Sequence, residues 1–508
     1  LATKIHRADK LEPMATIQAE SKWNFWLTLP QPKKRMAMKV DSRKNAIMPS
    51  MAWAHSTQEG KKLRTAHIGV GNMGGEDLRD ISSHAMVEVV ALCDVDANNL
   101  KAAKELHPNA KTYKDYRIML TEMGDDIDAV VVSTPDHTHA PASMMAMNMN
   151  KPVYCQKPLT HHVSEARAMR KLAEEKNLVT QMGIQVHSFY DYKLATLLIR
   201  SGIIGKVSQV HAWSPKNWGY DDPKPEGSDP VPETLDWNLW LGTSAEREYK
   251  EGVYHPGNWR KLVDYGCGTL GDMGVHIFDT PYNALALDVP KTIINNCREP
   301  NGFGFPENNT VIYEFPGTQY TTDEFKWTWY DGPGAPAENE DLKLPGNSDV
   351  PDKGIESNTD EKSVEEKMSL ETKETKEGKL PEQGAMFIGE KGRLLLPHFM
   401  ELPKKIVDGK YVDISAEIEA VEKANNMGKP IRDYTSEGPK HYHQFVDACL
   451  GKDKTTAPFS YAARLTETIL LGVIAGRFPG KTLHWDNATA KFAEEEANAF
   501  LESPYREF

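Results

Sequence analysis

The chain has 508 residues, of which 39% are hydrophobic and 26% charged, with a formal net charge of −13 and a sequence pI near 5.8. This length allows two or three domains. The acidic balance argues against nucleic acid or an anionic membrane surface as a partner, and no apolar run is long enough to span a bilayer. Five scattered cysteines without a C-x-x-C spacing support neither a disulfide framework nor a zinc site.

Residues 1–62 show no sustained hydrophobic period, so we expect an irregular N-terminal extension. Within it, Arg43 and Lys44 precede a short apolar run with a faint A-x-A pattern. The run is short and contains Pro49, which makes it a poor match to a secretory signal peptide. The compartment therefore stays open between the bacterial cytoplasm and an exported location.

From about residue 63, short apolar runs alternate with helical hydrophobic patterns. The strand-like runs cover residues 66–70, 87–93, 129–133, 153–156 and 179–182, and the helical patterns cover 76–81, 97–106, 115–123, 141–150 and 164–176. Near-continuous apolar strands joined by helices are typical of a parallel sheet covered on both faces. The sequence therefore predicts an α/β fold that begins with a doubly wound Rossmann sheet over residues 63–184, with a ligand at the carboxyl ends of its strands.

The first strand-like run leads directly into a G-x-G-x-x-G sequence. Gly69 permits a tight turn, Gly71 lets a pyrophosphate approach the backbone, and Gly74 lets the following helix pack close to the strand. Asp94 ends the next run, where an acid accepts hydrogen bonds from a ribose 2′-hydroxyl and repels a 2′-phosphate. No Arg or Lys follows it directly, which favours NAD over NADP. The predicted cofactor contacts here are Gly69, Gly71, Asn72, Met73, Gly74 and Asp94.

Polar residues also follow three later strands of the predicted sheet. They are Thr134, Pro135, His137 and His139, then Gln156 and Lys157, and finally Gln185 and His187. Because the carboxyl ends of parallel strands meet at one edge of a sheet, we predict that His187 faces the substrate and that the others contact the cofactor. The H-x-H pair, His137 and His139, lacks a third ligand at a suitable spacing, so we predict no metal site.

Three further residues are candidates for chemistry. Lys157 lies between a predicted strand and Pro158. An arbitrary lysine at a strand end is usually a surface residue. This strand, however, ends at the predicted nucleotide site, which favours a functional role for Lys157. Asp272 and His276 are four residues apart, so on a helix they lie on one face. This spacing fits equally well a catalytic pair and a capped helix with a buried structural histidine.

Four residues just ahead of this pair are candidates for substrate contact: Tyr254, His255, Trp259 and Arg260. The indole of Trp259 offers a flat apolar face to a sugar ring, and His255 and Arg260 offer hydrogen bonds to hydroxyl groups. The same residues fit an ordinary domain interface equally well.

After about residue 185, apolar and polar residues alternate in several segments. Strands are predicted over residues 309–315, 319–329, 385–388 and 392–396. This pattern is typical of an antiparallel sheet with one face on a core. It favours a second, α+β domain over residues 185–486, with amphipathic helices over 441–450 and 461–478 packed against a sheet.

Two segments of the second half are expected to carry little packed structure. Residues 335–380 contain no aromatic side chain and are rich in Glu, Lys and Asp, which predicts a solvated, mobile acidic insertion because such a composition buries too little apolar surface. Residues 487–508 are expected to form a charged C-terminal tail.

Taken together, the glycine turn, Thr134-Pro-Asp-His-Thr-His139, Gln156-Lys-Pro158 and Gly271-Asp-Met-Gly-Val-His276 resemble the Gfo/Idh/MocA family, the group of glucose–fructose oxidoreductase and inositol dehydrogenase. The resemblance runs from about residue 63 to 486, interrupted by the acidic insertion. It implies a Rossmann domain followed by a domain with a large, mostly antiparallel open sheet, through which a homodimer or homotetramer forms. Some secreted carbohydrate-acting bacterial members look most similar, which adds weight to an exported protein.

The resemblance also implies roles for individual residues. Lys157 is expected to contact substrate and cofactor, His276 to act as acid and base on the substrate oxygen, and Asp272 to assist. Gln156 stands where many members have Glu, which should alter the electrostatics around Lys157.

The predicted function is NAD-dependent hydride transfer from a secondary CH–OH of a sugar, glycoside or polyol. One alternative is a redox-neutral glycosidase that oxidises, eliminates and re-reduces its substrate with retained NAD. A second is a regulator that binds NAD without catalysis, against which the intact set of Lys157, Asp272 and His276 speaks.

Overall fold

The computed structural model of the chain describes residues 60–345, 379–428 and 433–508. The predicted N-terminal extension and residues 346–378 of the predicted acidic insertion lie outside these ranges. Within the described ranges, no helix combines the length and the apolar character that crossing a bilayer requires.

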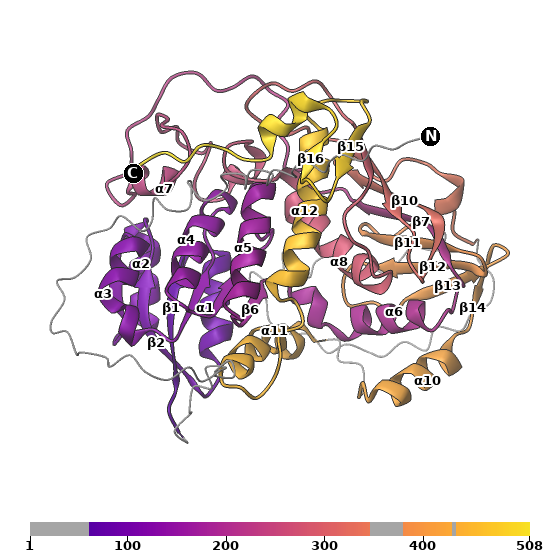
Figure 1. Cartoon of the computed structure of the whole chain (residues 1–508), viewed down its shortest axis with the longest axis horizontal. Coiled ribbons are helices and arrows are strands. Elements are labelled where there is room, and N and C mark those ends of the chain that lie inside the picture. The colour runs from indigo at the N-terminus through magenta and orange to yellow at the C-terminus, as the bar shows by residue number, and fades with distance from the viewer. Residues whose placement is uncertain (1–59, 346–378, 429–432) are drawn as a thin grey trace, which may run out of the picture. The chain divides into compact units, whose positions relative to one another are not determined.

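The first sheet is the parallel, doubly wound sheet that the sequence predicts (Figure 1). Its six strands lie in the order β3-β2-β1-β4-β5-β6, and every neighbouring pair is parallel. They are β1 (Leu63–Ile68), β2 (Val87–Cys93), β3 (Lys111–Tyr113), β4 (Ala129–Val132), β5 (Val153–Cys155) and β6 (Thr180–Met182). The connecting helices are α1 (Met73–Ser82), α2 (Ala97–Leu106), α3 (Tyr116–Met123), α4 (Asp136–Asn148) and α5 (Val163–Glu175). The order reverses between β1 and β4, and a ligand binds at such a switch point in open α/β sheets.

A helix from far along the chain completes the core of this sheet. The α11 helix (Tyr434–Cys449) packs beside α1. Its Tyr442 stacks on Tyr154 of β5 with ring centroids 5.3 Å apart, and Phe445 meets the same ring edge-on. All three rings are fully buried, so α11 is part of the packing of the Rossmann sheet.

The second sheet has ten strands in the order β14-β13-β12-β11-β7-β10-β9-β8-β15-β16 and is antiparallel except for the β7–β10 pair. The strands are β7 (Val207–Ser214), β8 (Thr292–Asn296), β9 (Asn309–Pro316), β10 (Thr321–Asp331), β11 (Gly384–Gly389), β12 (Gly392–Pro397), β13 (Lys404–Val407), β14 (Lys410–Val412), β15 (Leu483–Asp486) and β16 (Lys491–Phe492). The large, mostly antiparallel second sheet is therefore confirmed.

Helices of the second half cover one face of this sheet. The helices α8 (Val275–Ala284) and α12 (Phe459–Ala475) contact its strands, α6 (Tyr190–Arg200) packs on α8, and α10 (Ser415–Asn425) packs on α6. The short helix α7 (Trp237–Leu241) belongs instead to a separate aromatic cluster. The α8 helix contacts β7 and β11, and its Phe278 stacks on Trp327 of β10 at 4.2 Å. The α12 helix contacts β8 on this side and α5 of the first domain. The α12 helix thus connects the core of one sheet to the core of the other.

Two segments expected to be loosely structured are packed where the structure describes them. Leu342, early in the predicted insertion, is buried with Trp213 and Tyr330 against the ten-stranded sheet. In the predicted tail, the hydroxyl of Tyr505 donates to Glu165 at 2.7 Å. The last residues of the chain are therefore bound to the first domain. Their apolar side chains are too few and too scattered for the sequence to predict this contact.

Candidate active site

The glycine turn after β1 leaves no room for side chains. Gly69 has φ of +81°, and a Cβ there would lie 2.5 Å from the carbonyl oxygen of Ser133. A Cβ on Gly74 would lie 2.3 Å from the carbonyl oxygen of Gly69. The first contact fixes the turn against β4, and the second holds α1 against the end of β1, as the dinucleotide fingerprint requires.

The start of α1 presents free donors at this turn. Among the described residues, the backbone N–H groups of Gly71, Asn72 and Met73 donate to no protein acceptor. Such groups at a helix N-terminus bind phosphate, because the helix dipole adds partial positive charge there. This part of the chain therefore fits the pyrophosphate of a dinucleotide.

Asp94 follows β2 beside the same turn. Its carboxylate accepts the N–H of Val70 at 2.9 Å and the N–H of Asp96 at 2.8 Å. Burial raises its pKa, although these hydrogen bonds oppose the rise. The two N–H groups fix the carboxylate next to the glycine turn, where the fingerprint places the acid that binds a ribose.

Gly69→Ala tests whether position 69 requires glycine because of the close contact with Ser133 as well as because of its positive φ. We expect the variant to lose about 1–3 kcal/mol of stability from the left-handed conformation alone, more from the contact with Ser133, and to lose NAD binding. The measurements are thermal unfolding and titration calorimetry with NAD. Gly202→Ala is the matched control, because Gly202 has φ of +80° with nothing within 4 Å of its added Cβ; an equal loss in both variants would contradict the contact.

The two histidines of the H-x-H pair are bound to backbone carbonyls. The ring nitrogens of His139 lie 2.8 Å from the carbonyl oxygens of Pro158 and Thr134, which ties together the loops after β5 and β4. His137 reaches the carbonyl oxygen of Trp240 at 3.0 Å. Burial lowers both pKa values to about 4. These hydrogen bonds give the two rings a structural role, and their contact with a cofactor stays a prediction. In the described ranges, no cluster of three or more metal-ligating side chains occurs.

Lys157 and Asp272 form an ion pair between the two domains. The Nζ of Lys157, just past β5, lies 2.9 Å from Oδ1 of Asp272 and also donates to its carbonyl oxygen at 3.1 Å. The guanidinium of Arg260 donates to the same Oδ1 at 3.2 Å and lies over the ring of Trp259. Burial would raise the pKa of Asp272, but the charges of Lys157 and Arg260 outweigh it and hold that pKa well below its usual range.

His276 follows Asp272 on the same helical segment. Residues Leu270–Gly274 form a π-helical turn that continues into α8, and such turns are frequent at functional sites. The ring of His276 is nine-tenths buried, and its Nδ1 has no partner in the described part of the chain. Burial and the charge of Lys157 hold its pKa well below the usual value. His276 is therefore a neutral imidazole beside a cation, able to accept a proton.

Gln156 and Gln185 belong to a hydrogen-bond network below the strand ends. Gln156 donates to both carboxylate oxygens of Asp77, at 2.8 and 3.0 Å, and its own oxygen accepts the N–H of Lys157. Gln185 donates to the hydroxyl of Tyr442, which in turn donates to Asp77 at 2.9 Å. Asp77, on α1, thus places a carboxyl group beside residue 156, where the resembling proteins often have Glu.

Asp77 gives a test of this network through the dependence of stability on pH. Burial raises its pKa from 3.8 to about 7, against the hydrogen bonds it accepts. Between these values the folded protein holds a proton that the unfolded chain has released, so this group makes stability fall as pH rises. In Asp77→Asn we expect this contribution to the pH dependence to vanish. The free energy of unfolding should then fall by about 3 kcal/mol less than in the wild type between about pH 5 and about pH 8. Thermal or urea unfolding at both pH values measures it, with Asp453→Asn on the surface as control; an unchanged slope would contradict the shift.

His187 lies beside α8. Its Nδ1 is 2.9 Å from both carboxylate oxygens of Asp279, and the hydroxyl of Tyr461 donates to the same carboxylate at 2.6 Å. His276 and Asp279 are three residues apart on α8. His187 is therefore oriented by a group on the helix that carries His276.

The predicted sugar-binding residues are divided by the structure. Tyr254 and Trp259 are buried, at 3% and 6% exposure, in an aromatic cluster, which favours the interface role that the sequence left open. His255 lies 3.0 Å from the carboxylate of Asp96, past β2. It therefore sits at the adenosine end of the predicted cofactor site, and Arg260 alone of the four reaches Asp272.

A segment of the second domain crosses this end of the Rossmann sheet. The N–H of Ala97 donates to the carbonyl of Thr234 at 2.8 Å, and the N–H of Asp236 donates to the carbonyl of Val95 at 2.9 Å. We call residues 234–236 the strap. Because it bonds the loop between β2 and α2, the strap lies beside the place where the fingerprint puts the adenosine ribose.

Sequence reasoning missed two residues near the ion pair. Asp136 begins α4 and is buried; burial raises its pKa to about 7 against the charges of Arg260 and Lys157. His398, in the loop after β12, has its ring centroid 6.4 Å from that of His276. Asp136 directly precedes the H-x-H pair and was not considered as a site residue, and no local pattern distinguishes His398.

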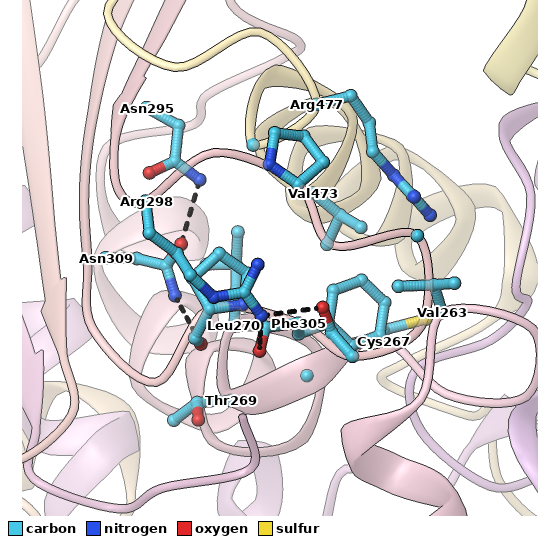
Figure 2. Close-up of a pocket in the computed structure, with 16 residues that line it drawn as sticks. Val263, Cys267, Thr269, Leu270, Asn295, Arg298, Phe305, Asn309, Val473 and Arg477 are labelled. Atoms are coloured by element: carbon cyan, nitrogen blue, oxygen red, sulfur yellow. Dashed lines mark hydrogen bonds between the residues drawn. The ribbon is translucent and has the colours of Figure 1, made fainter. Parts of the chain in front are cut away.

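A small cavity lies behind the π-helical turn (Figure 2). Its volume is about 30 Å³, and Cys267, Leu270 and Arg298 are in its wall, which is room for about one or two water molecules. Figure 2 shows the guanidinium of Arg298 bound to carbonyl oxygens of this wall. Neither Lys157 nor Asp272 lines it, so this cavity is separate from the candidate active site.

The fold and the glycine turn define the class of protein: a dinucleotide-binding protein with a Rossmann domain. Residues 63–184 match the NAD-binding Rossmann fold of the Gfo/Idh/MocA oxidoreductase family, and residues 193–294 match the C-terminal alpha/beta domain of that family. The chain thus carries an NAD-binding domain and a C-terminal domain of the Gfo/Idh/MocA family, in this order.

Curated relatives match part of this chain, and solved structures share its fold. An inositol 2-dehydrogenase of Salmonella paratyphi B is 34% identical over 154 residues, which are 29% of this chain and 45% of that protein. A 2,7-anhydro-N-acetylneuraminate hydratase of Mediterraneibacter gnavus is 27% identical over 32% of this chain and 42% of its own length. The chain thus spans less than half of these relatives. The WlbA dehydrogenase of Chromobacterium violaceum, solved with NADH and UDP-GlcNAcA, shares the fold with a TM-score of 0.54 and 14% identity over 84% of this chain and 97% of that one.

Proposed function

We propose that the protein transfers hydride between NAD and a secondary CH–OH of a sugar, glycoside or polyol. The observation that carries this proposal is the ion pair of Lys157 and Asp272, which joins the end of β5 to the turn that precedes His276. It brings a cation and a neutral imidazole to the carboxyl edge of a nucleotide-binding sheet. A regulator without catalysis has no need of this pair.

Each of these side chains has a distinct task in the proposed reaction. The nicotinamide, when bound, accepts or returns the hydride. The neutral ring of His276 takes the proton of the substrate hydroxyl, as a general base within hydrogen-bond reach does. The ammonium of Lys157 stabilises negative charge on that oxygen. Asp272, whose carboxylate also accepts a hydrogen bond from Arg260, holds the ammonium in place.

The substrate class and the cofactor form rest on different observations. The names of the relatives, inositol 2-dehydrogenase among them, favour a polyhydroxylated ring. The carboxylate of Asp94 beside the glycine turn favours NAD over NADP, because it repels a 2′-phosphate. We further propose a homodimer or homotetramer through the open sheet, which light scattering of the purified protein tests.

The first experiment is to purify the protein and release any bound nucleotide by denaturation. Bound NAD(H) identified by mass spectrometry, followed by NADH formation with one or more members of a panel of inositols, aldoses and glycosides, supports the proposal. Absence of nucleotide binding, measured by calorimetry with NAD and NADP, contradicts it.

A second candidate is a redox-neutral lyase or glycosidase with retained NAD. The strap favours it, because a segment bonded across the loop after β2 slows exchange of a dinucleotide. The relative named a hydratase also favours a reaction without net oxidation. Cleavage of an aryl glycoside without accumulation of NADH distinguishes this candidate from a dehydrogenase.

A further inference from the structure

A second imidazole, that of His398, lies close to the ring of His276 at the candidate site. His398 lies in the loop after β12 of the ten-stranded sheet, and His276 lies at the start of α8. Their ring centroids are 6.4 Å apart, with 41° between the ring planes. Two imidazoles at this separation can reach neighbouring atoms of one small ring, but they are too far apart for a direct hydrogen bond between their nitrogens.

His398 is held in place by a tyrosine and by the backbone. Its Nδ1 is hydrogen-bonded to the hydroxyl of Tyr192, a buried residue of α6. The backbone N–H of His398 donates to the backbone carbonyl of Gln383 at 2.9 Å. The Nδ1 is thus occupied, and within the described ranges Nε2 has no protein partner. This matches the pattern of a catalytic imidazole whose second nitrogen fixes its orientation.

Both imidazoles are neutral near neutral pH. Burial, followed by the charge of Lys216, lowers the pKa of His398 to about 4. His276 is nine-tenths buried with an unpartnered Nδ1. Oxidation of one hydroxyl needs a single base, and His276 already supplies it. A second neutral imidazole therefore exceeds what a simple dehydrogenase requires.

We propose that His398, oriented by Tyr192, is a second acid/base residue that acts on the carbon next to the one oxidised. The inference rests on the proposed function, since the carbon must first become the neighbour of a ketone. It extends that function to substrates that carry a leaving group two carbons from the new carbonyl, such as glycosides.

The proposed elimination follows ordinary carbonyl chemistry. The ketone makes the adjacent C–H acidic, and Nε2 of His398 accepts its proton. The electron pair of that C–H bond forms the enolate double bond, and the negative charge moves to the former carbonyl oxygen, near the ammonium of Lys157. The enolate then re-forms the carbonyl, and the electron pair of its C=C bond moves to the next C–C bond to give an enone. The C–O bond to the leaving group breaks, and the leaving oxygen keeps the electron pair of that bond and takes the proton that Nε2 of His398 had accepted. Water adds to the resulting enone in the reverse sense, which gives a ketone that a bound NADH would reduce.

The test supplies the ketone directly, so that proton abstraction is measured apart from oxidation. Keto-inositols and keto-glucopyranosides are incubated with the NAD-loaded protein in D2O. Proton NMR follows exchange at the carbons beside the carbonyl, and NADH consumption with the same ketones measures hydride transfer. We expect the wild-type protein to exchange one adjacent proton of a ketone that it also reduces.

Substitutions separate the two histidines. In His398→Gln we expect exchange to fall by ~10²–10⁴-fold, the usual contribution of a general base, while hydride transfer to the ketone changes by less than ~10-fold. Tyr192→Phe should lower exchange in the same direction and by less. The matched control is His211→Gln, because Nδ1 of His211 also pairs with a tyrosine hydroxyl, that of Tyr330 at 3.1 Å, on the same sheet; it should leave exchange unchanged.

Three outcomes would overturn the role of His398. The first is no exchange in the wild-type protein with a ketone that it reduces, and the second is exchange at the wild-type rate in His398→Gln. The third is an equal loss of exchange and hydride transfer in that variant, which indicates a structural residue. Failure to reduce any ketone and to bind NAD overturns the proposed function itself, through measurements independent of the exchange.

Discussion

Lys157→Met is expected to lower kcat/KM for the best substrate by ~10²–10³-fold, the range found when one stabiliser of a developing oxyanion is removed. Methionine keeps an unbranched side chain only one heavy atom shorter and removes the charge that lies 2.9 Å from Asp272. The pKa of Asp272 should rise at the same time, because one of the two cations that lower it is gone. NADH formation under initial-rate conditions measures the effect.

Binding of NAD should survive this substitution. The glycine turn, the free N–H groups at the start of α1 and Asp94 are all intact in Lys157→Met, so we expect NAD affinity within about tenfold of wild type. Lys171→Met, on an exposed face of α5, is the control for loss of a lysine. Turnover that stays at the wild-type level would show that Lys157 is a structural ion-pair residue only.

His276→Asn is expected to cost ~10²–10⁴-fold in kcat/KM, the contribution of a general acid/base. It should also change the pH profile. The pKa of His276 is held well below its usual value, so the ring stays able to accept a proton across the neutral range. In the oxidative direction the wild-type activity should fall only as pH drops below the ordinary range of histidine.

This acidic limb is the specific signature of His276. It should disappear in His276→Asn and persist in His484→Asn, whose imidazole pairs with Glu494 on the surface. An acidic limb that is unchanged in His276→Asn would assign the titration to another group, and the catalytic base would then have to be sought elsewhere.

Most of the Rossmann sheet was predicted from the sequence, because the central strands β4, β5 and β6 are buried on both faces and β1 nearly so. The run at β2 (Val87–Cys93) and the helix at α2 (Ala97–Leu106) agree with the predicted bounds at both ends. β3 (Lys111–Tyr113) was missed, since it has three polar or half-exposed residues and pairs with β2 alone. β15 (Leu483–Asp486) was missed for a similar reason, because only Leu483 and Trp485 of its four residues are buried.

The site was only partly readable. The glycine turn is a local feature, and the close contacts that require glycine at positions 69 and 74 are those that the G-x-G-x-x-G spacing suggests. The approach of Lys157 to Asp272, 115 residues apart, came from resemblance and not from spacing, because no local rule connects two domains. Asp77 and His398 could not be found, since their importance lies in what α11 and the ten-stranded sheet bring beside them.

The stacking of Tyr442 on Tyr154 has a consequence for protein engineering. A fragment that ends at residue 184, where the matched nucleotide-binding region stops, would leave the aromatic face of β5 open to water and Asp77 without its phenolic donor. Such a fragment is expected to aggregate. Exchange of nucleotide-binding halves between relatives should therefore transfer residues 434–449 together with the first 184.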